Sequence, residues 1–367
     1  MDSRSFENGQ SAFVSASCFL PMFLRAITLV FGPVLLIAGC YFMTVGRGQF
    51  SAQAATDDRG SQYQRDFDVD ALHAGAEHGL APRDDGSRVA AKNQLDVACD
   101  ERARQLREHL TSSDRIIVRP PYVLAGNVSE SELDRQYRET ILPTARALSL
   151  AYFDHTPDEP VTLLLFSSEE AYRNASWHLD RRNTTDYYGY YIRPDRRIVL
   201  NLSTGDGTLA HELTHALAHF DFPQMPEWFD EGLASVFEEA DFSPDGLQLV
   251  GVSNWRLNHL LHAMQQRRLK TLESLITARK VDSDNQEVLY AQARYFCLYL
   301  QERGLLPFFY RKFRRQHSSD PSGARTLCSV LGTDDFDSID RDFRRWVIAL
   351  YERLKTPPQH AELKPGR

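Results

Sequence analysis

The stretch TLAHELTHALAHF, residues 208–220, decides the fold, because its residues recur at helical spacing. His211 and His215 stand four residues apart, so on a helix they lie one turn apart on the same face. The apolar residues of the stretch fall on the opposite face: Leu209, Leu213, Ala216, Leu217 and Phe220. That face predicts a helix anchored to a core, which holds the two imidazoles in a fixed geometry.

Two imidazoles at this spacing are able to bind one zinc ion, and HExxH on a helix is a metal-binding pattern. Glu212 follows His211 and is rotated by about 100° around the helix axis. Its carboxylate is therefore predicted beside a bound metal rather than on it, where it acts as general base toward the attacking water. The alternative interpretation is a pair of exposed histidines on a surface helix.

A third ligand is predicted in PEWFDEGLA, residues 226–234. A hydrolytic zinc site has three protein ligands and one open position. Glu231 lies sixteen residues past His215, behind the loop DFPQMP, which is long enough to reverse the chain and bring a second helix back. Gly232 lacks a Cβ, which is expected to permit two helices to approach closely there. The predicted ligands of one Zn²⁺ per chain are therefore His211, His215 and Glu231.

Together, HELTHALAHF and WFDEGLASVFEE resemble the gluzincin zinc metallopeptidases of the thermolysin-like zincin class. They are most similar to the peptidase MA-like domains of bacterial envelope proteins, in which HExxH and the Glu of W-x-x-E-G-x-A supply the ligands. The resemblance covers roughly residues 160–303. It implies hydrolysis of peptide or protein substrates by metal-activated water. Three other zincin types lack support, because their HExxHxxGxxH, G-A-M-E-N or G-T-x-D segments are missing.

The resemblance extends less well to the residues around the ligands. Where thermolysin-like enzymes carry an acid that orients the first histidine, this chain has Ser235, so Glu238 or Asp230 is the candidate substitute. Tyr290 is the candidate oxyanion donor, as a downstream tyrosine is in related gluzincins. The alternative for Tyr290 is a tyrosine of the core or of a helix start. His219, one turn further along the zinc helix, either faces the cleft or is a partly exposed histidine.

Strands and helices are predicted before residue 208 and almost only helices after it, which is an α+β layout. The upstream elements are a strand interrupted by Pro120 and Pro121, a helix at 129–153 that begins at Ser129 or Ser131, and a central strand at 161–166. A helix capped by Ser167 or Ser168 and β-type runs at 187–192 and 197–202 follow. A further strand is considered at 247–252. The tyrosines of the run at 187–192 form either an edge strand, which pairs with substrate backbone in this family, or ordinary sheet packing.

Residues 26–45, AITLVFGPVLLIAGCYFMTV, carry no charge and are long enough to cross a bilayer as a helix. Three interpretations fit: an uncleaved signal anchor, a signal peptide cleaved after Ala52-Gln53-Ala54, or a lipoprotein signal with a lipobox that ends at Cys40. A buried core helix is disfavoured because the apolar run shows no helical periodicity of polar residues. The rest of the chain is therefore expected to be membrane-anchored on the extracytoplasmic side, in a bacterial cell envelope.

The predicted domain organisation has a signal or anchor segment, a polar linker with a short polar helix, a catalytic domain and a flexible tail, at 1–45, 46–112, 113–356 and 357–367. The predicted fold is α+β: a thermolysin-like zincin domain with a small N-terminal mixed sheet and a helical C-terminal half, behind an N-terminal membrane segment.

Composition excludes other classes of protein. The net charge is −8 and no Lys/Arg-rich tract occurs, so no nucleic-acid partner is expected. The five cysteines include no CxxC, which argues against a cysteine zinc site, and Cys297 is expected to be buried and inert. The rival function is a membrane-tethered, zinc-stabilised but inactive binding or scaffold domain. A chain with that function is expected to lack Glu212 or one of the metal ligands, and this chain has all of them.

Overall fold

The computed structural model describes residues 14–18, 85–185, 187–278 and 285–356. The chain divides into two compact units, residues 1–20 with 93–367 and residues 21–92, and most of the second lies outside the described residues. The predicted membrane segment at 26–45 and the predicted tail at 357–367 also lie outside them. Among the helices that are described, none is long and apolar enough to cross a membrane.

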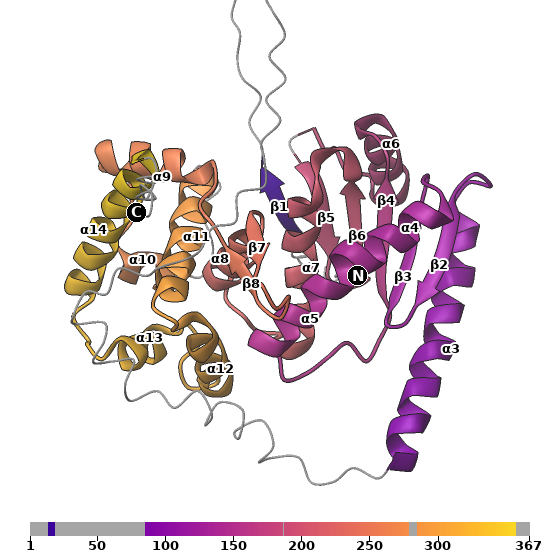
Figure 1. Cartoon of the computed structure of the whole chain (residues 1–367), viewed down its shortest axis with the longest axis horizontal. Helices are drawn as coiled ribbons and strands as arrows, with labels where there is room; N and C mark the ends of the chain where they lie inside the picture. Colours follow the sequence, from indigo (N-terminus) through magenta and orange to yellow (C-terminus); the bar gives the residue numbers. More distant parts are fainter. Residues whose placement is uncertain (1–13, 19–84, 186, 279–284, 357–367) are drawn as a thin grey trace, which may run out of the picture. The chain divides into compact units, whose positions relative to one another are not determined.

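A six-stranded mixed sheet forms one part of the fold (Figure 1). Its strands, in spatial order, are β1 (Val14–Cys18), β5 (Tyr187–Ile192), β6 (Arg197–Asn201), β4 (Val161–Phe166), β3 (Tyr122–Gly126) and β2 (Arg115–Arg119). Strands β3, β4 and β6 run parallel, whereas β1, β2 and β5 pair antiparallel with their neighbours. The predicted central strand is confirmed as β4, and the run broken by Pro120 and Pro121 folds as the β2–β3 hairpin.

The helices that accompany the sheet are α3 (Asp85–His109), α4 (Glu130–Gln136), α5 (Leu142–Ala151) and α6 (Glu169–Asp180), with a π-helical turn, η1 (Tyr137–Ile141), between α4 and α5. Ser129 and Ser168 each accept a hydrogen bond from a backbone N–H of the first turn, so the structure selects Ser129 over Ser131 for α4 and Ser168 over Ser167 for α6. Helix α3 begins earlier than the polar helix expected inside the linker. Its Cys99 and Leu106 are buried, because they pack in an apolar cluster with the sheet.

The two faces of the sheet are covered separately, because successive residues of a strand point to opposite sides. In β4, Leu163 and Leu165 belong to the larger core, which continues into the helical half of the chain. Leu164 and Phe166 belong to a smaller core that also holds buried residues of α3 and α6. Every residue of β4 is buried for this reason, which explains why its sequence is apolar apart from Thr162.

Strand β5 has a neighbour on each side, since β1 pairs with one edge and β6 with the other. Tyr190 and Tyr191 are buried, and the Tyr190 hydroxyl donates a hydrogen bond to Asp180 at 2.6 Å. For these two tyrosines the structure favours sheet packing over an exposed substrate-pairing edge.

Helices dominate after the sheet, which confirms the α+β class (Figure 1). They are α7 (Asp206–Asp221), α8 (Glu227–Val236), α9 (Arg256–Gln265), α10 (Leu272–Thr277), α11 (Gln286–Glu302), α12 (Leu306–Gln316), α13 (Ala324–Leu331) and α14 (Phe336–Lys355). A short 3₁₀ turn, η2 (Leu202–Thr204), precedes α7. The strand considered at 247–252 is β8 (Leu249–Gly251), and it pairs antiparallel with an unpredicted strand, β7 (Ala240–Phe242).

Helices α8 and α11 approach closely at Gly232. A Cβ on this residue would lie 3.0 Å from Cys297 Sγ and 3.1 Å from the Ala293 carbonyl oxygen, both on α11. The prediction that Gly232 permits a close helix approach is therefore confirmed, although the partner is α11. Cys297 is fully buried, as expected, and burial raises the pKa of its thiol.

Candidate metal centre

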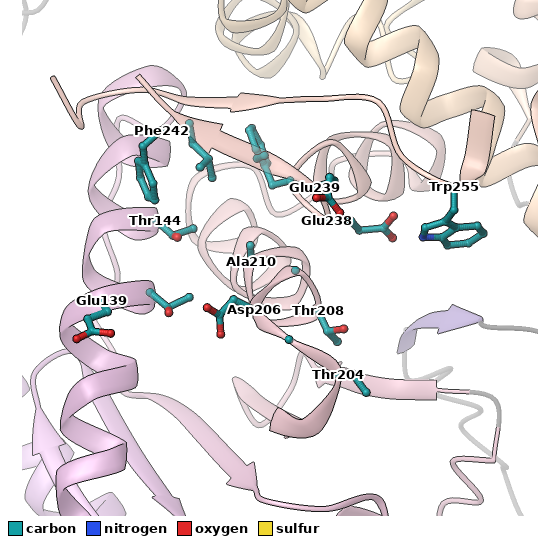
Figure 2. A pocket seen from close by; sticks show the side chains of 16 residues that line it. Glu139, Thr144, Thr204, Asp206, Thr208, Ala210, Glu238, Glu239, Phe242 and Trp255 are labelled. Carbon is teal, nitrogen blue, oxygen red and sulfur yellow. The ribbon is translucent and has the colours of Figure 1, made fainter. Parts of the chain in front are cut away.

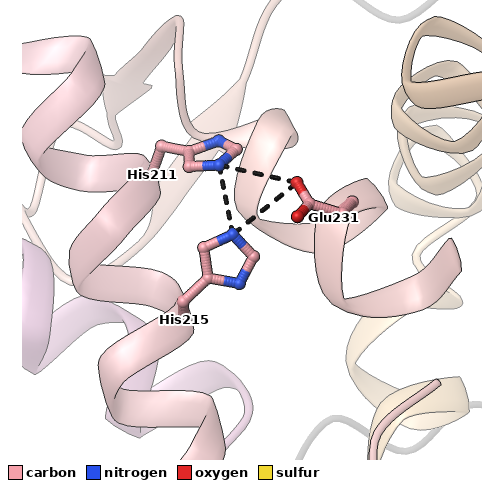
Figure 3. Close-up of side chains that lie close together, drawn as sticks. All are labelled: His211, His215 and Glu231. Atoms are coloured by element: carbon pink, nitrogen blue, oxygen red, sulfur yellow. Dashed lines mark hydrogen bonds and ion pairs between the residues drawn. The ribbon is translucent and has the colours of Figure 1, made fainter. Parts of the chain in front are cut away.

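Three predicted ligand side chains converge between α7 and α8 (Figure 3). His211 and His215 project from α7 with their Nε2 atoms 3.1 Å apart. Glu231 projects from α8, and its Oε2 atom lies 3.7 Å from each of these nitrogens. Tetrahedral ligands about 2.1 Å from an ion stand roughly 3.4 Å from one another. The three separations are therefore compatible with a shared metal ion.

The surroundings of the three side chains also favour a cation. All three are buried, and Glu231 Oε2 has no hydrogen-bond partner among the described residues. The two histidine nitrogens at 3.7 Å are beyond hydrogen-bond distance, so a metal ion would supply this buried carboxylate oxygen with a closer partner. Burial lowers the pKa of His215, but the Asp230 and Glu231 carboxylates outweigh it and hold that pKa well above its usual value. The same negative potential attracts a metal ion.

Each histidine is supported from behind by a different carboxylate. His215 Nδ1 lies 2.7 Å from Asp230 Oδ1, and His211 Nδ1 lies 3.3 Å from Glu238 Oε1. An imidazole that donates Nδ1–H to a carboxylate presents Nε2 to a metal. Both candidate substitutes for the missing acid therefore contact a histidine, while Ser235 is buried with no hydrogen-bond partner among the described residues.

The two supporting carboxylates are held ionised by different partners. Burial alone would raise the pKa of Asp230, but His219 and His215 lower it far below its usual range. Burial also opposes ionisation of Glu238, and there Arg256 is the largest influence that lowers the pKa. Arg256 donates to both oxygens of Glu238, at 2.8 and 2.6 Å, and is itself buried.

Arg256 is the member of this arrangement that sequence reasoning misses. It lies eighteen residues past Glu238, beyond the β7–β8 hairpin, and its guanidinium carbon is 4.4 Å from the centroid of the Trp255 ring. No local spacing in the sequence predicts such a pair, because the two residues come together through the fold and not within one helix or strand.

His219 belongs to the support of the centre rather than to the three ligands. Its Nε2 lies 2.8 Å from Asp230 Oδ2, so Asp230 bridges His219 and His215. These three side chains form a second grouping able to hold a metal, but the two groupings share His215. The His215 Nδ1 atom that faces Asp230 is the one directed away from His211 and Glu231 (Figure 3).

Glu212 is fully buried on α7 and is not one of the grouped ligand atoms. Its carboxylate is close enough to Tyr172 of α6 to raise the pKa of that phenol, after the larger effects of burial and of Tyr190.

Tyr290 is buried on α11 and accepts a hydrogen bond from Gln286 Nε2 at 2.8 Å. Burial and then the charge of Glu231 raise the pKa of its phenol above the usual range, so the hydroxyl stays protonated at neutral pH. Because the charge of Glu231 affects the pKa of Tyr290, the phenol lies near the third predicted ligand, where an oxyanion donor is expected.

The described residues thus contain buried histidine and carboxylate groups able to hold a metal ion. Comparison with known proteins adds no family to this description: no protein-family model matches the chain, and no curated protein matches it.

Proposed function

We propose that this protein is a zinc-dependent peptidase of the gluzincin type, with a thermolysin-like catalytic domain similar to the peptidase MA-like domains. The observation that carries the proposal is the buried convergence of His211, His215 and Glu231 (Figure 3). The carboxylates behind both imidazoles support it further, since partners of this kind orient metal-bound histidines.

The donor set suits zinc. Two imidazole nitrogens and one carboxylate oxygen are the ligands of catalytic zinc sites of the His₂Glu kind, whereas calcium and magnesium prefer a larger number of oxygens. When bound, zinc lowers the pKa of a water molecule from about 15.7 toward 7 and polarises the scissile carbonyl. The chain's own residues then have to move protons and stabilise charge.

Glu212 is the general base in this proposal. Its carboxylate accepts a proton from the attacking water and passes it to the leaving amine. Complete burial separates Glu212 from bulk water, which limits loss of the proton to solvent. Tyr290 donates a hydrogen bond to the substrate oxygen that becomes negative during the attack.

The proposed location follows from the uncharged stretch at 26–45, which lies outside the described residues. The stretch anchors or exports the chain, and the catalytic domain faces the extracytoplasmic side of a bacterial membrane. The substrates are peptides or proteins exposed on that side.

The test is zinc content and hydrolysis of an unfolded protein, measured on the same preparations of the full-length wild type, His215→Ala and His178→Ala. His178 is the control, because it is an exposed histidine on α6. The wild type and the control should each hold about one zinc and be inhibited by a chelator. His215→Ala should lose both properties, and full zinc retention in it overturns the ligand assignment. A zinc-loaded wild type that cleaves no peptide favours the inactive scaffold.

A further inference from the structure

A cavity of about 530 Å³ lies beside Glu238, the carboxylate behind His211 (Figure 2). Its walls come from η1 and α5, from the start of α7, from the end of α8 with the β7–β8 hairpin, and from Trp255. A volume in the range of about 300 to 1,000 Å³ is typical of ligand pockets. The space is therefore large enough for one long side chain.

Two residues connect this cavity with the centre. Glu238 lines the cavity and contacts His211 Nδ1 at 3.3 Å. Thr208 also lines it and precedes His211 by three residues on α7, so the two share a helix face. Glu238 and Thr208 thus place the cavity next to His211, on the Nδ1 side of its imidazole.

The charge of the cavity is of one sign. Its lining contains the four carboxylates Glu139, Asp206, Glu238 and Glu239, and no Lys, Arg or His. Glu238 is neutralised by Arg256, and Glu139 lies 3.2 Å from Arg135. Asp206 and Glu239 form no ion pair within the described part of the chain. Asp206 also sits in the first turn of α7, where a carboxylate is favoured by the helix dipole, and Glu239 lies close enough to the buried Arg294 to oppose the lowering of the Arg294 pKa by burial.

Two buried threonine side chains line the interior of the cavity. Thr140 and Thr144 are 8% and 3% exposed, and both line the space. Neither hydroxyl hydrogen-bonds to another described residue. Figure 2 shows Thr144 pointing from α5 into the space and the Asp206 carboxylate directed toward the same helix. Apolar surface from Phe237, Ala210 and Leu249 completes the lining.

The charge and the lining of the cavity favour a cationic ligand, and they indicate which kind of cation fits. A bare metal ion requires clustered ligands, and among the described residues the groupings of three close ligand atoms occur only around His215. Separated carboxylates, buried hydroxyls and apolar walls instead fit an aliphatic chain that ends in a cationic hydrogen-bond donor. We propose that the cavity binds the side chain of a lysine or arginine of the substrate, close to the scissile bond. The inference rests on the proposed peptidase function for its biological meaning, but the binding itself does not require hydrolysis.

The first experiment measures binding to the full-length protein by calorimetry, with Nα-acetyl-lysine amide and its neutral analogue Nα-acetyl-norleucine amide as probes. The lysine probe should bind about tenfold more tightly at low salt, since two exposed charge pairs are each worth roughly two- to fivefold. The double variant Asp206→Asn/Glu239→Gln should remove that preference, and Thr144→Val should reduce it. Asp337→Asn is the control, because Asp337 is an exposed acid in the first turn of α14. Equal binding of the two probes, or an unchanged preference in the double variant, overturns the inference.

The second experiment measures hydrolysis of a peptide library by the same proteins. A preference for Lys or Arg at one position beside the cleaved bond, lost in the double variant while neutral peptides are still cleaved, supports the inference. Cleavage without a basic preference contradicts the inference and leaves the peptidase function intact. Selective binding of the lysine probe with no cleavage of any peptide contradicts the peptidase function and leaves the cation site intact.

Discussion

Replacing Asp230 with asparagine isolates the support that lies behind the metal ligands. Asp230 takes one hydrogen bond from His215 Nδ1 at 2.7 Å and one from His219 Nε2 at 2.8 Å. Asparagine has one carbonyl oxygen, so it is able to accept only one of them, and its amide group faces the other imidazole. The negative charge that fixes the His215 ring is also lost.

Loss of a partner of this kind costs about 10- to 100-fold in metal affinity. At about 1.4 kcal/mol per tenfold, the weakening is about 1.4 to 2.8 kcal/mol. Asp230→Asn should therefore bind zinc 10- to 100-fold more weakly, while much of the hydrolysis returns at saturating zinc, because no ligand is removed. The assay is competition for zinc with a chromogenic chelator, with Asp337→Asn as the control for an exposed carboxylate. An unchanged zinc dissociation constant refutes the role given to Asp230.

Three further variants test other parts of the account. Gly232→Ala should destabilise the protein by about 1 to 3 kcal/mol, because its Cβ would lie 3.0 Å from Cys297 Sγ. Denaturant midpoints of the wild type and of Gly232→Ala measure this loss of stability, and an unchanged midpoint argues against the close packing. A smaller loss of stability is expected in the double variant Gly232→Ala/Cys297→Ala. Tyr290→Phe should keep zinc and lower kcat by about 10²–10³-fold, as loss of an oxyanion donor does; kcat within twofold of wild type removes Tyr290 from the chemistry. Membrane fractionation of Cys40→Ser separates the interpretations of residues 26–45: lost anchoring indicates a lipoprotein, unchanged anchoring a membrane helix, and cytosolic recovery of the wild type contradicts export.

Elements with a strong local pattern are predictable from the sequence. The α7 helix follows from the period of its histidines and leucines, and β4 follows from a short run that is apolar apart from Thr162. The caps of α4 and α6 follow in the same way, since Ser129 and Ser168 act on their own first turns.

Features made by tertiary contacts are not predictable in this way. Helix α3 has a polar sequence, and its packing depends on a few buried residues such as Cys99 that meet the sheet. The β1–β5 pairing joins segments far apart in sequence, so no local signal marks it. Within the centre, the spacing of His211, His215 and Glu231 indicates the ligands, but the pairing of Glu238 with Arg256 requires the fold.

In the proposed mechanism, Glu212 moves a proton while three other side chains hold the metal. Glu212→Gln keeps the size and shape of the side chain but is unable to accept a proton at neutral pH. General-base catalysis is worth typically about 10²–10⁴-fold. The most direct measurement is therefore zinc content, thermal melting and peptide hydrolysis on one preparation of this variant. The account predicts a folded protein with wild-type zinc content and hydrolysis slower by at least about 10²-fold. Hydrolysis at the wild-type rate by zinc-loaded Glu212→Gln would contradict it.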